Sequence, residues 1–370
     1  MSESGRLLSL DAFRGLTVAA MVLVNNPGTW RAVYPPLRHA EWDGWTPADL
    51  VFPFFLFIVG VAIPLALGRR LSTGLPRSAV TVKIVRRSVI IFALGLLLHA
   101  IPHLDLATIR IPGVLQRIAV CYAVAALVFL WTGWRGQAGL TIALLLGYWA
   151  ALTLVPVPGF GAGRLDPEGS LAAYLDRAVF GQHVWRTARV YDPEGLLSTL
   201  PAIATTLTGV LAGHWLRSGG SRRKIALGFA VAGIAGILVG ELWNAWFPIN
   251  KALWTSSYAV FTAGAALLVL AACYWLVEIR GHRAWTRPFV VLGVNALALF
   301  FLSSLVARLL IVVKVPGDAG RTPLHAWLYG HGFAPWASPL NASLAYAVAY
   351  LSLWLGVLWL LDRYHVRLTV

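Results

Sequence analysis

The sequence predicts an all-α membrane protein, a polytopic bundle of transmembrane helices. Of the 370 residues, 58% are hydrophobic and only 12% are charged, whereas a soluble domain carries about 25% charged residues. The mean hydropathy is +0.72. The apolar residues form continuous runs of about 20 residues, the length that a helix needs to cross a bilayer. Helices are expected rather than strands, because the runs do not alternate with polar residues and a helix satisfies its own backbone in lipid.

Ten apolar runs are candidate spans within a single domain, residues 1–370. The expected spans are 9–26, 48–68, 86–102, 111–132, 138–156, 196–216, 224–247, 252–278, 287–313 and 340–361. The first run resembles a signal peptide, but Asp11 and Arg14 interrupt it, so we expect a retained helix. No internal repeat or linker divides the chain, which favours one bundle.

The basic residues indicate how the helices are oriented. Lys and Arg are concentrated in connections that share a side with the N-terminus, above all in 69–87 and 217–224. Cytoplasmic connections of membrane proteins carry such an excess. Both termini are therefore expected in the cytoplasm, and 157–195 becomes the longest extracytoplasmic loop. The net charge of +15 is explained by these orientation signals, so the expected partner is the lipid bilayer and not a nucleic acid.

The cysteine positions and the lack of an ATP-binding motif argue against a metal site and against direct ATP hydrolysis. Cys121 and Cys273 both lie inside apolar runs, without the spacing of a disulfide framework or a metal site, so no metal is expected. The chain lacks the glycine-rich loop with a following lysine that cradles phosphates in ATP-hydrolysing proteins. Direct ATP hydrolysis is therefore not expected.

The stretch 38–53 places titratable residues directly before the second apolar run. Unpaired charges are costly in lipid, so titratable residues at the start of a span suggest a functional site. We single out His39, because a neutral imidazole takes a proton from an attacking amine or hydroxyl, or itself carries an acyl group. The alternative is a loop histidine that only makes a hydrogen bond. Glu41 and Asp43 are expected to be surface groups.

Asp49 allows two interpretations that do not exclude each other. Thr46 and Pro47 have the sequence of a helix start, which makes Asp49 the third helical residue and a partner in a capping box. Alternatively, its carboxylate orients His39 or binds a cationic amine. Asn25, near the end of the first span, is either an ordinary helix stop or a donor to a carbonyl oxygen or an oxyanion.

Four polar residues inside the spans are further candidates. Gln116 and Arg117 lie one to two turns into the fourth span, where an arginine must be paired or face a polar cavity. An anionic ligand meets this need, and so does a salt bridge, for instance to Glu241. Arg14 follows an acidic residue by three positions, which predicts an ion pair along the helix. Asn295 is a lone polar group for which an interhelical hydrogen bond is the simpler explanation.

Five segments together carry a resemblance to a known family. They are SLDAFRGLT at 9–17, HAEWDGWTPADLVFP at 39–53, RIPGVLQR at 110–117, YDPEG at 191–195 and FPINKALWT at 247–255. In this order they resemble the heparan-α-glucosaminide N-acetyltransferase family, in the compact form of its bacterial relatives. The resemblance covers about 9–275, which is most of the chain.

The resemblance implies an activity and a set of site residues. The family moves an acetyl group from cytosolic acetyl-CoA to the amine of a terminal glucosamine on the far side of the membrane. His39 matches its active-site histidine, Asn25 matches the partner asparagine, and Asp49 matches the aspartate of the Thr-x-Ala-Asp-Leu motif. The residues that we expect to contact acetyl-CoA are Arg14, Gln116, Arg117 and Asn295.

The resemblance also bears on the acceptor and the location. The lysosomal members carry a luminal region that is not in this sequence, so the expected acceptor is a periplasmic, cell-envelope or free amino sugar. The protein is expected in the bacterial inner membrane as a multi-pass protein, with a homodimer as one option. Both direct attack by the amine, with His39 as general base, and an acetyl-histidine intermediate are compatible with these residues.

Two other function classes fit the same composition. One is an amino-sugar or anion transporter, which ten spans with internal polar groups allow. The chain shows neither an inverted repeat nor the paired broken helices that are typical of many transporters. The other is an O-acyltransferase that acts on an envelope polysaccharide, because other membrane acyltransferases share the opening motif at 9–17.

Overall fold

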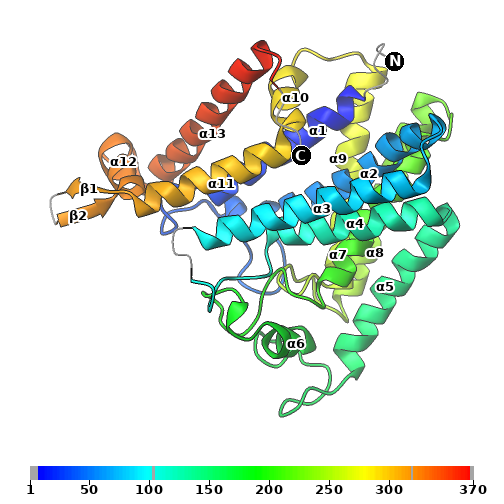
Figure 1. Ribbon diagram of the computed structural model, residues 1–370, viewed down its shortest axis with the longest axis horizontal. Helices are drawn as coiled ribbons and strands as arrows, with labels where there is room; N and C mark the ends of the chain where they lie inside the picture. The colour runs from blue at the N-terminus through cyan, green and yellow to red at the C-terminus, as the bar shows by residue number, and fades with distance from the viewer. Residues whose placement is uncertain (1–6, 102–104, 318–319, 367–370) are drawn as a thin grey trace.

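The computed structural model describes residues 7–101, 105–317 and 320–366. Apart from one small hairpin, the described chain consists of helices and the loops between them (Figure 1). The long helices are α1 (Leu8–Asn25), α2 (Val51–Ser72), α3 (Arg77–Ala100), α4 (Val114–Trp131), α5 (Trp134–Leu154), α7 (Thr199–Leu216), α8 (Arg222–Asn244), α9 (Ser256–Tyr274), α11 (Ala296–Val312) and α13 (Pro339–Arg363).

The remaining elements are short. They are the 3₁₀ turns η1 (Pro35–Leu37), η2 (Pro47–Leu50) and η3 (Gly181–His183), the helices α6 (Leu171–Phe180), α10 (Thr286–Val294) and α12 (Leu324–Gly332), the π turn η4 (Trp275–Ile279) and the strands β1 (Lys314–Gly317) and β2 (Gly320–Pro323). The two strands pair in antiparallel fashion, with Lys314 opposite Pro323. The polytopic helical fold predicted from the sequence is therefore confirmed in its class.

Helices occupy all the ranges that the sequence predicts as spans, but their suitability for a membrane differs. Seven helices of the described chain are long and apolar enough to cross a bilayer, or eight if the bent pair α10–α11 counts as one span. Neither α3 nor α7 is among these helices, and in α3 the residues Lys83, Arg86 and Arg87 make the first half too charged. A total of ten spans and the cytoplasmic position of both termini stay predictions.

The expected span at 287–313 is not one continuous helix, because the chain bends there by 78° between α10 and α11. Asn295 stands at the bend with φ −108° and ψ 23°, and its side-chain amide donates a hydrogen bond to the carbonyl of Val291. Asparagine competes in this way with the helical backbone and favours helix ends. The bend lets α10 pack on α1, where a Cβ at Gly15 would meet the backbone of Phe289, and α11 continues at 78° to α10 (Figure 1).

Two glycine contacts hold the helices that carry the site in close packing. Gly60 on α2 and Gly209 on α7 face each other so closely that a Cβ at Gly60 would lie 2.0 Å from the carbonyl oxygen of Thr206. A Cβ at Gly15 on α1 would lie 1.7 Å from the carbonyl oxygen of Phe289 on α10. Small residues of this kind let helices in membranes approach backbone to backbone. They fix α1 and α2 within the bundle.

The loops that carry the sequence motifs gather at one end of the bundle, together with α6 (Figure 1). Direct contacts tie them to one another. The indole N–H of Trp42 donates to the carbonyl of Leu165 over 3.0 Å, and Asp43 forms an isolated β-bridge with Asn250. Segments that are far apart in the sequence are thereby held around the same space.

Candidate functional site

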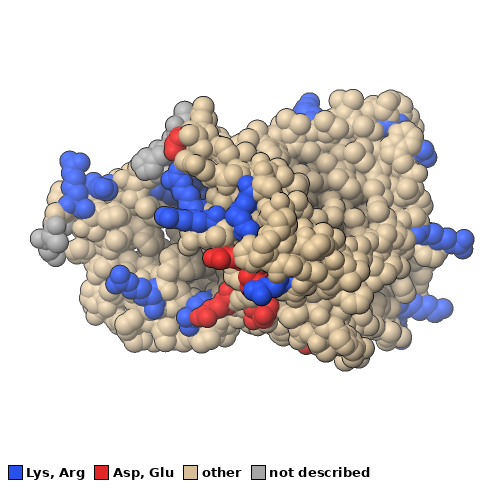
Figure 2. All heavy atoms as spheres, turned by 90° about the horizontal axis from the view of Figure 1, so that it is seen from below, with Lys and Arg blue, Asp and Glu red and all other residues tan. Residues whose placement is uncertain are grey.

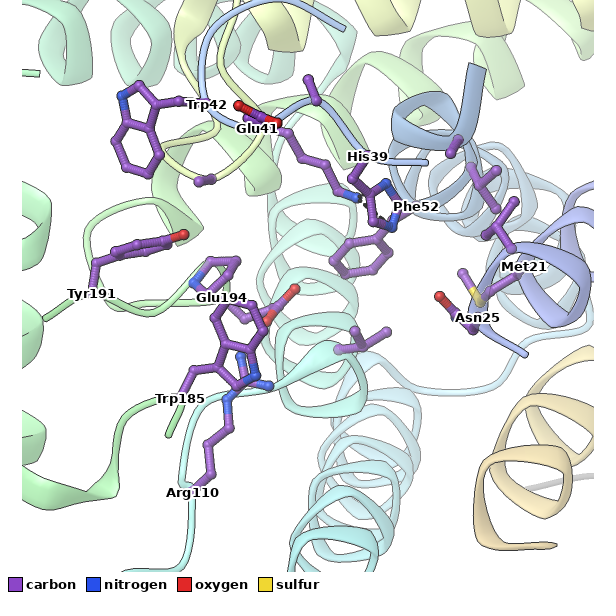
Figure 3. A pocket seen from close by; sticks show the side chains of 18 of the residues that line it. Met21, Asn25, His39, Glu41, Trp42, Phe52, Arg110, Trp185, Tyr191 and Glu194 are labelled. Atoms are coloured by element: carbon purple, nitrogen blue, oxygen red, sulfur yellow. Dashed lines mark hydrogen bonds and ion pairs between the residues drawn. The ribbon is translucent and has the colours of Figure 1, made fainter. Parts of the chain in front are cut away.

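The loop-rich end of the bundle contains a cavity of about 360 Å³, which we call the histidine cavity. Helices α1 and α2 and several loops contribute to its wall (Figure 3). The wall residues with polar or aromatic side chains that bear on its chemistry are Asn25, His39, Glu41, Trp42, Arg110, Trp185, Tyr191, Glu194 and Lys251. The cavity thus brings together residues from all the motif segments except the first.

His39 and Asp49 form the central pair of this cavity. The Nδ1 atom of His39 lies 2.7 Å from Oδ1 of Asp49. The Asp49 side chain is 1% exposed, whereas that of His39 is 39% exposed. A carboxylate only accepts hydrogen bonds, so this contact places a proton on Nδ1, and in the neutral imidazole the lone pair is then on Nε2. An imidazole in this state is ready to accept a proton from a substrate.

Asp49 serves the helix start and the histidine at the same time. Its Oδ2 accepts hydrogen bonds from the backbone N–H groups of Ala40 and Thr46, both over 3.0 Å. Thr46 is the N-cap of η2 with Pro47 after it, and the capping box is formed as predicted. The other carboxylate oxygen of Asp49, Oδ1, contacts His39. The two interpretations of Asp49 therefore use different oxygens, and the structure contains both contacts.

Lys251 is a third member of this cluster, and no pattern in the sequence singled it out. Its Nζ lies 3.2 Å from Oδ1 of Asp49 and 2.9 and 3.3 Å from Nδ1 and Nε2 of His39. Burial lowers the pKa of the Lys251 ammonium, and the carboxylate of Asp49 opposes this effect. The buried carboxylate therefore has a cation beside it, as a buried charge requires.

The position of Lys251 depends on the loop between α8 and α9. Asn250 holds this loop, because its Oδ1 accepts a hydrogen bond from the N–H of Leu253 over 2.8 Å and its Nδ2 donates to Asp43 over 3.1 Å. Lys251 is 212 positions away from His39, so no sequence spacing connects the two residues. The one available signal was its place in the segment FPINKALWT, which also contributes to the family resemblance.

Asn25 lies at the end of α1 and lines the histidine cavity, on the side opposite Trp42 and Tyr191 (Figure 3). No hydrogen bond from a described residue reaches its side chain. The neighbouring Asn26 instead bonds back to the helix, since its Nδ2 donates to the carbonyl of Val22 over 2.7 Å. The helix-stop function therefore belongs to Asn26, and the amide of Asn25 is available to a ligand.

Aromatic rings and carboxylates form the wall that faces His39. Trp42 and Tyr191 meet edge to face with ring centroids 5.1 Å apart, and Trp185 lies 6.4 Å from Tyr191. Glu41 and Glu194 add two carboxylates to the same wall. Flat apolar faces beside a few polar groups are typical of sites that bind small molecules.

Ionic contacts anchor the segment 191–195 at this wall. Nε of Arg110 donates to Oδ2 of Asp192 over 2.8 Å, and its Nη2 bonds both Asp192 and Glu194. Burial by itself lowers the pKa of Arg110, but the carboxylates of Glu194 and Asp192 outweigh it and raise the pKa above its usual value. Behind this segment, a Cβ at Gly195 would lie 2.0 Å from Oδ2 of the buried Asp176.

A second cavity of about 300 Å³ lies further along the same helices, and we call it the arginine cavity. Arg14 and Asn295, two of the predicted contacts to the donor, line it together with Arg70 and Arg87. Nη1 of Arg14 also lies 3.3 Å from Asp11, which is the predicted ion pair along α1. The rest of the wall is mainly apolar. The cavity thus combines positive charge with an apolar interior.

The two cavities are about one helical turn apart on three helices, which is roughly 5.4 Å along each axis. On each helix, one residue lines the histidine cavity and the residue four positions away lines the arginine cavity. The pairs, in that order, are Val51 and Phe55 on α2, Val114 and Ile118 on α4, and Phe300 and Ala296 on α11. The side chains of these pairs therefore lie between the two spaces, and none of the lining residues is shared by both cavities.

Gln116 and Arg117, the other two predicted donor contacts, line neither of these cavities. Arg117 is 2% exposed. Its Nη2 donates to the carbonyl of Gly195 over 3.1 Å and to the hydroxyl of Ser198, and its guanidinium lies 5.2 Å above the ring of Trp254. The alternative salt bridge to Glu241 is wrong, because these groups are the partners of Arg117.

Comparisons with known proteins find relatives for most of the chain. A family model described as a domain of unknown function (DUF5009) matches residues 6–207. The heparan-alpha-glucosaminide N-acetyltransferase of Mus musculus is 32% identical over 356 residues, which cover 81% of this chain and 53% of the relative. The enzyme of Homo sapiens is 32% identical over 355 residues, which cover 80% and 52%. The resemblance inferred from the motifs is thereby confirmed, and the chain spans about half the length of these curated relatives.

Proposed function

Because the chain belongs to the family described as a domain of unknown function, DUF5009, and resembles curated N-acetyltransferases over most of its length, we propose that it is a transmembrane acetyltransferase. Its donor is acetyl-CoA from the cytosol, and its acceptor is the amine of a glucosamine-type sugar on the extracytoplasmic side of a bacterial inner membrane. One observation carries this proposal. The His39–Asp49 pair lies in a cavity that is one helical turn from a second, basic cavity.

The histidine cavity is proposed as the place of acyl transfer. Nε2 of His39 takes a proton from the acceptor amine as the new N–C bond forms and the C–S bond of the thioester breaks. That proton then neutralises the departing thiolate. Asp49 holds the imidazole in the required tautomer through Nδ1. The amide of Asn25 and the ammonium of Lys251 are the candidate donors to the oxyanion that develops on the carbonyl.

The arginine cavity is proposed to receive the donor. Arg14, Arg70 and Arg87 supply the positive charge that phosphate groups need, and the apolar wall suits the pantetheine arm. Asn295 offers an amide at the bend between α10 and α11. A thioester that reached past the apolar side chains between the two cavities would bring its carbonyl towards His39.

The acceptor is proposed to bind against the aromatic wall. Trp42, Trp185 and Tyr191 offer flat faces to a sugar ring, and the carboxylates of Glu41 and Glu194 attract the ammonium form of its amine, which gives up one proton to water before its lone pair attacks. Of the two routes considered from the sequence, direct attack uses these features without a covalent intermediate. The acetyl-histidine route uses the same Nε2 atom as a nucleophile.

One observation favours a second candidate, an amino-sugar transporter. α10 and α11 form a broken helix beside the arginine cavity, and broken helices line substrate sites in many transporters. Proteoliposomes without acetyl-CoA distinguish the two functions, because uptake of labelled glucosamine under these conditions identifies a transporter.

The central experiment measures acetyl transfer directly. Purified protein is incubated with acetyl-labelled acetyl-CoA and glucosamine, and labelled N-acetylglucosamine is expected. Absence of both product and stabilisation by acetyl-CoA in a thermal-shift assay contradicts the proposal. Incubation with acetyl-CoA alone, followed by mass spectrometry of the peptide that contains His39, separates the two routes, because only the covalent route leaves an acetyl group there.

A further inference from the structure

The side chain of Lys251 places a primary amine where the proposed acetyl transfer needs one. An acceptor amine has to come within reach of His39, and Nζ of Lys251 already lies 2.9 and 3.3 Å from Nδ1 and Nε2 of that residue. Both side chains line the histidine cavity, in which the thioester is proposed to react. The chain therefore carries an amine of its own beside the place of acyl transfer.

The other lysines of the chain do not share this environment. The sequence contains four lysines, and the remaining three, Lys83, Lys224 and Lys314, are exposed and line none of the cavities described above. An exposed lysine is almost fully protonated at pH 7, and only a neutral amine has the lone pair that attacks a thioester. Burial lowers the pKa of Lys251, although the carboxylate of Asp49 opposes this change. Lys251 is therefore the lysine best suited to react.

The amine of Lys251 is also held in place. Its Nζ lies 3.2 Å from Oδ1 of Asp49, the same oxygen that contacts His39. The backbone N–H of the neighbouring Asn250 donates to the hydroxyl of Thr255 over 3.0 Å, which fixes the loop that carries the lysine. A nucleophile held near its reaction partner reacts faster than one that diffuses freely.

An acceptor sugar would compete with Lys251 for the space beside His39. Figure 2 shows basic and acidic side chains gathered next to each other beside a hollow on the face at the loop-rich end. The carboxylates of Glu41 and Glu194 in the cavity wall attract the amine of a sugar that enters. While no sugar is bound, the amine nearest to His39 is that of Lys251.

Resting on the proposed function, we propose that Lys251 is a site of self-acetylation, which the protein carries out when donor is bound and acceptor is absent. The ammonium of Lys251 gives one proton to water, and the lone pair of Nζ attacks the thioester carbonyl. The N–C bond forms, the C–S bond breaks, and a second proton from Nζ passes through Nε2 of His39 to the departing thiolate. The products are acetylated Lys251 and free CoA. Asp49 then has lost its cation, so acetyl transfer to a sugar slows.

The test uses the unmodified protein with acetyl-labelled acetyl-CoA and no acceptor. Mass spectrometry gives the labelled fraction of each lysine over time, and the exposed lysines are internal controls for non-enzymatic acetylation. We expect Lys251 to be labelled at least about tenfold faster than they are. An excess of glucosamine should suppress the labelling of Lys251 and leave that of the controls unchanged. The starting protein is also checked for unlabelled acetyl groups, since their presence on Lys251 alone supports the proposal too.

Variants connect the modification to the site and to activity. His39→Ala should lower the labelling of Lys251 to the rate of the exposed lysines, whereas His331→Ala should not. Preincubation of the unmodified protein with acetyl-CoA should lower the initial rate of glucosamine acetylation by about tenfold, the effect of one lost contact to a charged group. Lys251→Arg has no amine to acetylate there, so its own initial rate should be the same before and after the preincubation.

The outcomes separate this proposal from the proposed function. Acetylation of glucosamine without an acetyl group on Lys251 overturns self-acetylation and leaves the acetyltransferase intact. Equal labelling of Lys251 in His39→Ala and in the unmodified protein also overturns it, because the reaction is then independent of the site. Absence of an acetyl group on both glucosamine and Lys251 contradicts the proposed function itself.

Discussion

The histidine cavity and the arginine cavity are built in different ways, although three helices run past both. In the histidine cavity, loops hold His39, Asp49 and Lys251 at hydrogen-bond distances, with Asp49 fixed further by two backbone N–H groups. In the arginine cavity, the basic side chains project from helices, and Arg70 and Arg87 are exposed. Chemistry requires fixed positions, whereas attraction of phosphates requires only charge within reach. The difference suggests that one space is built for reaction and the other for binding.

The largest effect is expected in the histidine cavity. Replacement His39→Ala removes the proton acceptor and lowers the rate of acetyl transfer by about 10²–10⁴-fold. We expect stabilisation by acetyl-CoA in a thermal-shift assay to persist, because the proposed donor site is the other cavity. The matched control is His331→Ala, since His331 is an exposed histidine on α12 that stacks on Trp327. A His39→Ala rate within a few fold of the unmodified protein would remove His39 from the mechanism.

Substitution of Lys251 tests whether the cluster of His39, Asp49 and Lys251 requires a positive charge for activity. Replacement Lys251→Met leaves the carboxylate of Asp49 without an opposite charge, and we expect a loss of about 10- to 100-fold in kcat/KM together with a lower Tm. Lys251→Arg, which keeps the charge, recovers part of the activity and moves the pH profile of kcat/KM back towards that of the unmodified protein. If Met and Arg at this position behave alike, the ammonium has no electrostatic function.

Substitutions in the arginine cavity are expected to change the affinity for the donor. Replacement Arg87→Gln raises the KM for acetyl-CoA by up to about tenfold, because one charged hydrogen bond to a phosphate is lost, and kcat changes little. Arg223→Gln is the matched control, since Arg223 is an exposed arginine at the start of α8 and lines none of the described cavities. The same KM for Arg87→Gln and Arg223→Gln argues against this cavity as the donor site.

The smallest effect on activity is expected at the edge of the histidine cavity. Replacement Gly195→Ala places a Cβ 2.0 Å from Oδ2 of Asp176, so the segment with Asp192 and Glu194 has to shift, at a cost of about 1–3 kcal/mol in stability. The acceptor KM rises a few fold and Tm falls. Gly147→Ala on α5 has open space around it and should leave both values unchanged or raise Tm. An unchanged Tm in Gly195→Ala shows that the segment adapts freely.

The sequence predicted more of the local structure than of the relations between distant segments. The capping box at Thr46 and the ion pair of Arg14 follow from residues three positions apart, and both are present. Contacts across the bundle do not follow from spacing, which is why Lys251 was missed. The position of a residue in a predicted helix indicates how far it lies along the span, but not which side chains of other helices it contacts. Arg117 is an example, because it contacts Trp254 and Ser198 rather than Glu241.

The bend at Asn295 shows a second limit of the sequence. The run at 287–313 is mainly apolar, so its composition predicts one span. Asn295, one of the polar residues within it, ends one helix and begins another, with α10 held against α1 by the close contact at Gly15. A helix break that depends on tertiary packing is hard to predict from composition, because one asparagine is tolerated in many continuous helices.

The apolar side chains between the two cavities have an electrical consequence. An ion that moved from one cavity to the other would have to leave its water among side chains such as Val51, Phe55 and Ile118, at a cost of several kcal/mol per charge. An uncharged acetyl group carries no such cost. If acyl transfer runs as proposed, a membrane that maintains a voltage would lose no charge through these side chains while acetyl groups pass between the cavities.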